Sequence, residues 1–441
     1  MPAWSLPRSL TDLLMAFRPC FTAPTFTTFS WLVVGLVAQP GTRTVTGMLV
    51  GARLAGGIWH HSRAHRFFAA ARWSADALGL VVLEVVVACL LGPVAPLRLV
   101  VDDTLFRRSG RKVFGAAWHH DPLGKGAKPV AWANCWVVVG VLVELPFVPQ
   151  RVVCLPVVCR LWRPKQPDRT KLALAVELVG LVAERCPDRQ VHLTGDAAYA
   201  GKTLRALPTQ VTVTTRLRSD AALYELAPPR TGRPGRPRRK GKRMPELIVL
   251  AALTRVRFKQ TVVCCYGELR VVELACLRCL WYGTFGPRPV QVVLVRSPGA
   301  PDGYDLALVT TDLAATPAEL VQRYAARWQV EVLFQEARQD AGVGQARNRT
   351  RTAVERTVPF GLVCVSLAVC WYALHGQPAA DVATRRALAP WYRAKHMVSF
   401  ADMLLALRRV ILAAQYLSAS LVEPTTAEIL AVQRAWAAAA A

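Results

Sequence analysis

Residues 316–338 decide the fold, and they read TPAELVQRYAARWQVEVLFQEAR. Thr316 suits an N-cap, Pro317 suits the first helical position, and Glu319 completes a capping box. Neither Gly nor Pro interrupts the two dozen residues after Pro317. The segment therefore predicts a helix that begins after Thr316 and continues through residue 338.

The polar residues of this helix are predicted to share one side. At about 100° per residue, Tyr324, Arg327 and Arg338 fall within roughly 40° of Glu331, whereas Glu336 points about 140° away. A carboxylate among groups that bind phosphate suits metal-assisted phosphoryl chemistry. The alternative is a solvated amphipathic helix with i,i+4 ion pairs such as Arg327–Glu331. Spacing alone leaves both interpretations open.

Composition indicates the kind of partner. The chain has 441 residues, is 53% hydrophobic and carries a formal net charge of +26. The length allows two or three domains with a sizeable core. Such a positive balance indicates a polyanionic partner, most simply nucleic acid.

Neither a membrane span nor a metal-binding cysteine site is expected. The longest apolar stretch, residues 77–101, is interrupted by charged residues, Gly and Pro. No run reaches the roughly 18 apolar residues that a spanning helix needs. Among the 12 Cys, only Cys276 and Cys279 have CxxC spacing, and a zinc site usually needs a second such pair. We expect a soluble cytoplasmic protein with reduced, buried thiols.

Two apolar runs end in acid. Leu99–Val101 precedes Asp102 and Asp103, and Gln190–Gly195 precedes Asp196. Such runs predict buried strands, and adjacent strand residues face opposite ways. Further predicted strands are 113–117 and 132–145, and further predicted helices are 10–17, 62–83, 170–185, 197–207, 354–375 and 400–417.

Residues 208–315 read as a β-rich segment that contains a basic loop. The predicted strands are 211–218, 261–266, 269–281 and 290–296. Between the first two lies the loop 228–243, which holds eight cations and no acid from Arg230 to Arg243. Its Pro and Gly content excludes regular structure. The cations expected to contact phosphate include Arg233, Arg236, Arg238, Arg239 and Lys240.

The pattern Tyr324-x2-Arg327-x3-Glu331-x6-Arg338 resembles the signature helix of a group of bacterial insertion-sequence DDE transposases, in which the last residue is usually Lys. The resemblance covers roughly residues 40 to 370. It implies an α/β fold: a ribonuclease-H-like catalytic domain with a β-rich insertion, flanked by helical N- and C-terminal regions. The implied units are a helical DNA-binding region (1–95), the first part of the core (96–207), the insertion (208–315), the second part of the core (316–375) and a helical C-terminal region (376–441).

The resemblance also implies the roles of the site residues. Asp102 or Asp103, Asp196 and Glu331 would be the catalytic carboxylates. The family often has Asp-x-Thr at this strand end, which favours Asp102 over Asp103 as the metal ligand. Asp102, Asp196 and Glu331 would then bind two Mg²⁺ ions, for which Mn²⁺ can substitute. The groups that would hold DNA are Tyr324, Arg327 and Arg338, with Trp281 stacking on a flipped base; the alternative for Trp281 is a buried strand position.

The implied activity is cut-and-paste transposition. The enzyme would hydrolyse a phosphodiester at each element end and join the freed 3′ hydroxyl to target DNA. The expected partners are double-stranded element ends and target DNA, bound by a homodimer in the bacterial nucleoid, with no membrane. Two alternatives remain open: a nuclease of the same fold without strand transfer, and a domesticated, non-catalytic DNA-binding repressor.

Overall fold

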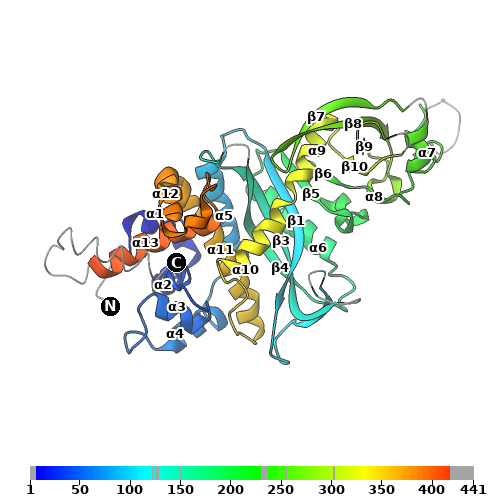
Figure 1. Ribbon diagram of the computed structural model, residues 1–441. Helices are drawn as coiled ribbons and strands as arrows, with labels where there is room; N and C mark the ends of the chain where they lie inside the picture. The colour runs from blue at the N-terminus through cyan, green and yellow to red at the C-terminus, as the bar shows by residue number, and fades with distance from the viewer. Residues whose placement is uncertain are drawn as a thin grey trace.

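The computed structural model describes residues 6–121, 124, 129–148, 151–229, 237–253, 256–300 and 303–417. A mixed sheet runs through the molecule. Helices of both chain ends lie together at one end of it, and the strands of the insertion lie at the other (Figure 1).

The N-terminal region is helical, as predicted, but its helices are shorter than expected. The predicted helix 62–83 is wrong as a single helix, because the chain turns at residues 70–74 and the Ser74 side chain caps a new helix by accepting from the Ala77 N–H. The elements are α1 (Arg8–Met15), the 3₁₀ turn η1 (Arg18–Cys20), α2 (Ala23–Ala38), α3 (Val45–Gly51), α4 (His61–Ala69) and α5 (Ala75–Leu90).

Ten strands form one sheet in the order β2-β3-β1-β5-β6-β10-β9-β8-β7, with β4 pairing on β3. In β1 the chain runs antiparallel to β3 and parallel to β5, which in turn is parallel to β6. Residues 208–315 join this sheet directly, because β6 pairs with β5 and β10 pairs with β6. The strands are β1 (Leu97–Arg107), β2 (Ala117–His120), β3 (Val130–Glu144), β4 (Val152–Trp162), β5 (Val191–Gly195), β6 (Val211–Arg216), β7 (Lys259–Cys265), β8 (Glu268–Cys279), β9 (Val290–Arg296) and β10 (Leu306–Thr310).

Three local predictions are wrong. The strand predicted to end at Val101 continues to Arg107, because the long partner β3 pairs with it throughout. Residues 113–116 form turns, with Gly115 at φ +70°, so β2 begins only at Ala117. The helix predicted at 197–207 is two 3₁₀ turns, η2 (Ala197–Tyr199) and η3 (Lys202–Ala206), separated at Gly201.

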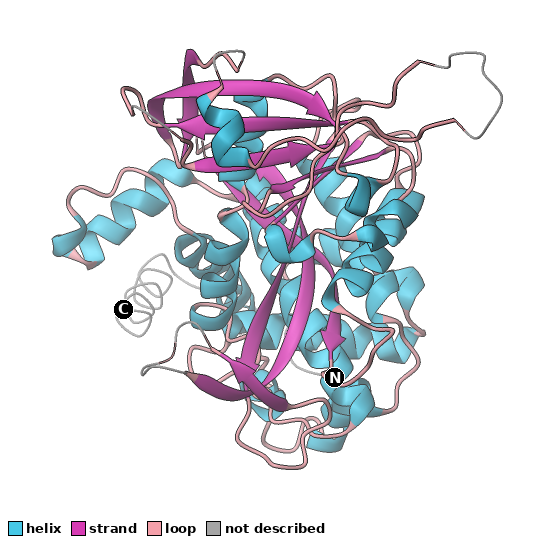
Figure 2. Cartoon of the chain, turned by 90° about the vertical axis from the view of Figure 1, so that its right-hand side faces the viewer, coloured by secondary structure: helices cyan, strands magenta, loops and turns pink. Residues whose placement is uncertain are grey.

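Helices cover both faces of the sheet (Figure 2). Helix α11 (Arg351–His375) is long and apolar enough to cross a membrane, but 89% of the residues in its most apolar stretch are buried inside the protein. It packs on α4, α5, β4 and α13 and is therefore a core helix. The remaining helices are α6 (Lys171–Arg185), α7 (Leu247–Ala252), α8 (Tyr282–Phe285), α9 (Pro317–Ala326), α10 (Gln329–Gln339), α11 (Arg351–His375), α12 (Pro378–Leu388), the 3₁₀ turn η4 (Pro390–Tyr392) and α13 (Phe400–Leu417).

One buried carboxylate organises the C-terminal helices. Asp402 is 3% exposed and accepts from Arg385 and Lys395, each at 2.8 Å. The Ser399 N–H and the Ser399 hydroxyl also donate to it, each at 2.8 Å. Burial alone would raise the pKa of Asp402, but the hydrogen bonds from Lys395, Ser399 and Arg385 outweigh it and lower the pKa to about 2. The ionised carboxylate therefore stabilises the fold.

We expect Asp402→Asn to lower the free energy of unfolding by about 2 kcal/mol at pH 7. Because the folded pKa lies below the unfolded value of 3.8, this stabilisation is present above about pH 4 and is lost as the pH falls toward 2. Urea unfolding of both proteins at pH 7 and pH 3 measures it. Asp220→Asn, at an exposed ion pair with Arg218, is the control and should change little. A difference that stays constant with pH would contradict the assignment.

Candidate active site

Residues 316–338, called the signature segment below, begin as predicted but do not form one continuous helix. The Glu319 N–H donates to the Thr316 hydroxyl and the Thr316 N–H donates to the Glu319 carboxylate, which completes the capping box. However, α9 ends at Ala326 and α10 begins at Gln329. Between them the Arg327 N–H bonds to the carbonyl three residues back, at 3.1 Å, so the turn is tightened. The tightening occurs where the Arg327 side chain reaches down to the sheet.

On the sheet, Asp102 and Asp196 lie in one row. The β1–β5 register pairs Leu97 with Val191 and Val100 with Thr194, a constant offset of 94. The pairing ends there, and Asp102 and Asp196 each lie two residues beyond the last pair, close enough for the Asp196 charge to raise the pKa of Asp102. Asp196 directly follows β5, and its carboxylate caps η2 by accepting from the Ala198 N–H at 2.9 Å. The row lies beneath the signature segment, because α9 packs on β5 and β6 and α10 packs on β1.

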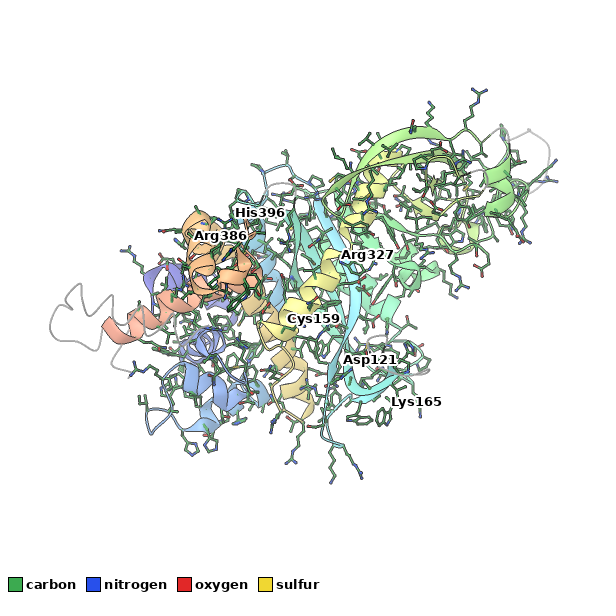
Figure 3. The ribbon with its side chains drawn as sticks, in the orientation of Figure 1. Asp121, Cys159, Lys165, Arg327, Arg386 and His396 are labelled. Carbon is green, nitrogen blue, oxygen red and sulfur yellow. The ribbon has the colours of Figure 1, made fainter. Side chains whose placement is uncertain are left out.

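Arg327 joins the helical segment to the sheet. Its Nη1 lies 3.1 Å from Asp102 Oδ2, and its Nη2 lies 3.1 Å from Glu331 Oε1. The side chain is 14% exposed, and Figure 3 labels it at the centre of the molecule, on the helical segment that crosses the sheet. Two of the predicted acids therefore converge on one guanidinium.

Asp103 faces the opposite side of the sheet from this cluster. Lys171 donates to its carboxylate at 2.6 Å, and the Tyr199 hydroxyl donates at 3.0 Å. The thiol of Cys135 also donates to it, at 3.4 Å. Asp103 thus belongs to a network that attaches β1 to α6 and η2, away from Arg327.

The cluster is a low-dielectric environment. Burial raises the pKa of Asp102 to about 7, with a further increase from the neighbouring charges of Asp196 and Asp103. The Asp103 N–H and the Arg327 charge act in the opposite direction. Burial also raises the pKa of Tyr324, whose hydroxyl experiences the charges of Arg327, Arg216 and Asp196. An additional cation would therefore be favoured here.

Arg338 and Tyr324 extend the same surface. Arg338 donates from Nη1 to the Thr104 hydroxyl at 2.6 Å, two residues along β1 from Asp102 and on the same face. The Arg327 guanidinium carbon lies 5.7 Å from the Tyr324 ring centre. The stripe predicted from helical spacing survives the break between the helices, because the tightened turn still follows a right-handed helical path.

One residue of this site was missed. Arg216 ends β6, and the β5–β6 register, which pairs Gly195 with Thr215, places it beside Asp196. The Thr215 hydroxyl also donates to the Asp196 carbonyl, at 2.8 Å. The only sequence signal was a cation at a strand end, and its meaning depends on the pairing of β5 with β6.

Glu336 lies away from the cluster. Burial raises its pKa to about 7, and its neighbours are Arg151 and Asp340 rather than Asp102. Its charge also raises the pKa of the buried Cys154 thiol on β4. This direction agrees with its predicted position off the polar stripe.

The remaining predicted DNA contacts lie elsewhere. Trp281 is half-buried just before α8, with its ring 5.9 Å from that of Phe285, so it is not within a strand. In the basic loop, Arg238 and Arg239 are exposed, while Lys240 Nζ lies 3.9 Å from the Tyr224 ring centre. The other two predicted loop contacts, Arg233 and Arg236, lie outside the described residues.

Asp102, Asp196 and Glu331 are the kind of side chain that binds a divalent cation. Carboxylate oxygens are the ligands that Mg²⁺ takes, and Asp102 and Glu331 already hold a cation, the guanidinium, between them. Arg327 Nε is buried without a hydrogen-bond partner, so this guanidinium is not fully satisfied in its place. In the part of the chain that the structure describes, no three His, Cys, Asp or Glu side chains are gathered closely enough to hold a metal as they stand.

Comparison with known proteins identifies the class. The family model described as DDE superfamily endonuclease matches residues 16–263, more than half of the chain. A second model, described as transposase DDE domain, matches residues 164–366. The chain belongs to the DDE superfamily endonucleases, and its central part is similar to transposase DDE domains.

Similarity to individual proteins is weaker. No curated protein matches the chain. A solved piggyBac transposase, in a synaptic complex with hairpin DNA, is 12% identical with a TM-score of 0.42, over 98% of this chain and 81% of that one. A likeness at this level supports no inference about this chain.

The position of Glu336 predicts a pH-dependent stability change. Its folded pKa of about 7 exceeds the unfolded value of 4.5, so stability is fully present below pH 4.5 and is lost as the pH rises through 7. We expect Glu336→Gln to raise the free energy of unfolding at pH 8 by up to about 3 kcal/mol and to change it little at pH 4.5. Glu268→Gln, at an exposed ion pair, is the control in the same urea titration. Destabilisation at pH 8 would contradict this account.

Proposed function

We propose that this protein is a DNA transposase that cuts element ends and joins them to target DNA by metal-dependent phosphoryl transfer. The observation that carries the proposal is the convergence of Asp102 and Glu331 on one cation, with Asp196 close enough for its charge to act on Asp102. The family membership supports an endonuclease or transposase activity. The metal, the DNA and the strand-transfer step are our inference from the acids, the net charge and the signature helix.

The proposed fold is ribonuclease-H-like. Strands β1, β3 and β5, with α6 on one face and α9–α10 on the other, would form the core (96–207 and 316–375). Residues 208–315 would be an insertion that extends the core sheet. The terminal regions, 1–95 and 376–441, pack against each other: Arg408 on α13 donates to the Val37 carbonyl of α2 at 2.9 Å. We propose that they form one DNA-binding helical unit.

In the proposed mechanism, Asp102, Asp196 and Glu331 would hold two Mg²⁺ ions. Such a pair activates water or a 3′ hydroxyl and stabilises the leaving oxygen. Burial of Asp102 strengthens its attraction for a cation. Because Asp103 is held by Lys171 and Tyr199 on the other face, we assign it the role of fixing β1, not of binding metal.

The phosphate would be oriented by groups on the same surface. Arg338, positioned by the Thr104 hydroxyl, and Tyr324 lie on either side of the acids along the segment. Guanidinium groups bind phosphate through paired hydrogen bonds. The freed 3′ hydroxyl would then be presented to target DNA at the same acids. Two copies, one for each element end, would act together in the cytoplasm on nucleoid DNA.

We expect Asp102→Asn, Asp196→Asn and Glu331→Gln each to abolish cleavage of DNA that carries the element ends, because each change removes a charged metal ligand. DNA binding in a mobility-shift assay should be nearly unchanged, since the basic surfaces remain. Glu336→Gln is the matched control on the same helix and should cleave normally. Normal cleavage by Glu331→Gln would refute the site. Binding without any Mg²⁺-dependent cleavage by the wild type would indicate a repressor.

The basic loop generates a separate expectation. Neutralising Arg233, Arg236, Arg238 and Arg239 should weaken binding to all DNA sequences and reduce the slope of log affinity against log salt by up to about 3.6, because each phosphate that the protein neutralises accounts for roughly 0.9 of that slope. Fluorescence anisotropy from low to moderate salt measures this slope. Neutralising Arg218 and Arg270, which pair with their own neighbouring acids, is the control. An unchanged slope in the loop variant would remove the loop from the DNA interface.

A further inference from the structure

Both oxygens of the Asp102 carboxylate already have donors. Oδ1 accepts from the Asp103 N–H at 2.8 Å, and Oδ2 accepts from Arg327 at 3.1 Å. Glu331 Oε1 accepts from the other end of the same guanidinium, at 3.1 Å. The three side chains are 18%, 14% and 36% exposed, respectively for Asp102, Arg327 and Glu331. One permanent cation is therefore shared between two acids that come from different elements.

We propose that Arg327 is an internal counter-ion, which holds the cation position between Asp102 and Glu331 until a divalent metal displaces it, and which then binds the DNA phosphate. This inference depends on the proposed function, because it assumes that these acids bind metal. It adds one step, the replacement of the Arg327 guanidinium by metal between Asp102 and Glu331, which metal binding by the acids does not by itself require.

Charge balance explains why a counter-ion is needed. Buried carboxylates without a cation are costly, and Asp196 adds negative charge beside Asp102. A guanidinium stays protonated at every relevant pH and reaches two carboxylates through its planar fork. It therefore stabilises the arrangement of the acids before a metal binds. A divalent metal needs the same oxygens, so the guanidinium and the metal compete for them.

Two features of Arg327 favour release of its guanidinium from Asp102 and Glu331. Its Nε is buried without a hydrogen-bond partner, so its fork is not fully used between the acids. Arg327 lies in the tightened turn between α9 and α10, where the backbone hydrogen bonds join residues that are three apart, as in a 3₁₀ helix, rather than four apart. The guanidinium already lies beside Tyr324, whose ring centre is 5.7 Å from it, so that after release from the acids Arg327 would remain on this surface next to Tyr324. There, two of its N–H groups can meet two phosphate oxygens.

The exchange couples metal to DNA. Metal binding releases Arg327 for the phosphate, and phosphate binding withdraws Arg327 from the acids. Each ligand therefore tightens the other by the same factor. A fixed structural ion pair would give no such coupling through Arg327.

The test measures Mn²⁺ binding to the DNA-free protein by electron paramagnetic resonance. We expect Arg327→Gln to bind Mn²⁺ at least about fivefold more tightly than the wild type, within the usual range of coupling between sites. Arg327→Lys, which keeps the charge but cannot span both acids, should fall between them. Glu331→Gln should lose the site, and Arg327→Gln combined with Glu331→Gln should not regain it.

Arg323→Gln is the matched control. Arg323 lies one turn earlier on α9, is 20% exposed and forms an ion pair with Asp312 at 2.7 Å, so it does not contact the three acids. If loss of any nearby positive charge were sufficient, Arg323→Gln would tighten Mn²⁺ binding as much as Arg327→Gln, and the displacement would be refuted. We expect no change in this control.

A second measurement reports on the coupling. DNA affinity, measured by anisotropy with Ca²⁺ to prevent cleavage, should rise more on adding metal in the wild type and in Arg323→Gln than in Arg327→Gln, which lacks the part of the coupling that passes through Arg327. If the wild type binds Mn²⁺ through Glu331 and Arg327→Gln binds it equally or more weakly, the counter-ion role is wrong while the metal site stands. If Glu331→Gln leaves wild-type Mn²⁺ binding unchanged, the proposed function itself fails.

Discussion

The bridge from Asp102 through Arg327 to Glu331 is the interaction on which the site depends. It connects strand β1 to the segment that crosses above it. An exposed ion pair contributes little, but the burial of Asp102 and Arg327 makes the unpaired alternative expensive for these two groups. The same bridge therefore sets the depth of the signature segment over the sheet and the distance between two acids that are more than 200 residues apart in the chain.

Two neighbouring acids of β1 point to opposite faces of the strand and have different roles. Asp102 faces the signature segment, while Asp103 faces α6 and is held by Lys171, Tyr199 and Cys135. Because successive strand residues alternate, attaching one acid firmly to α6 fixes the direction of the other. Asp103 is thus part of the reason that Asp102 points toward Arg327.

The surrounding architecture keeps this arrangement rigid. The insertion is not a separate body on a linker, since its first strand β6 pairs with β5 and continues the sheet beside Asp196. At the other end, the buried α11 packs on both the N-terminal helices and β4. The sheet, part of the insertion and the helical end therefore share one hydrophobic core, and a second, smaller cluster lies between the insertion strands and α9.

The sequence by itself determined the local features. The capping box at Thr316, the polar stripe of Tyr324, Arg327, Glu331 and Arg338, and the direction of Glu336 all follow from helical spacing and cap chemistry, which act over a few residues. Most strands were recognisable for the same reason, because their apolar runs reflect burial of the segment itself. Tertiary structure decided the rest. The extension of β1 past Asp102 depends on the partner β3, the position of Arg216 depends on the β5–β6 register, and the break at Arg327 occurs where its side chain meets Asp102. These outcomes depend on which distant segments pair, and no local pattern carries that information.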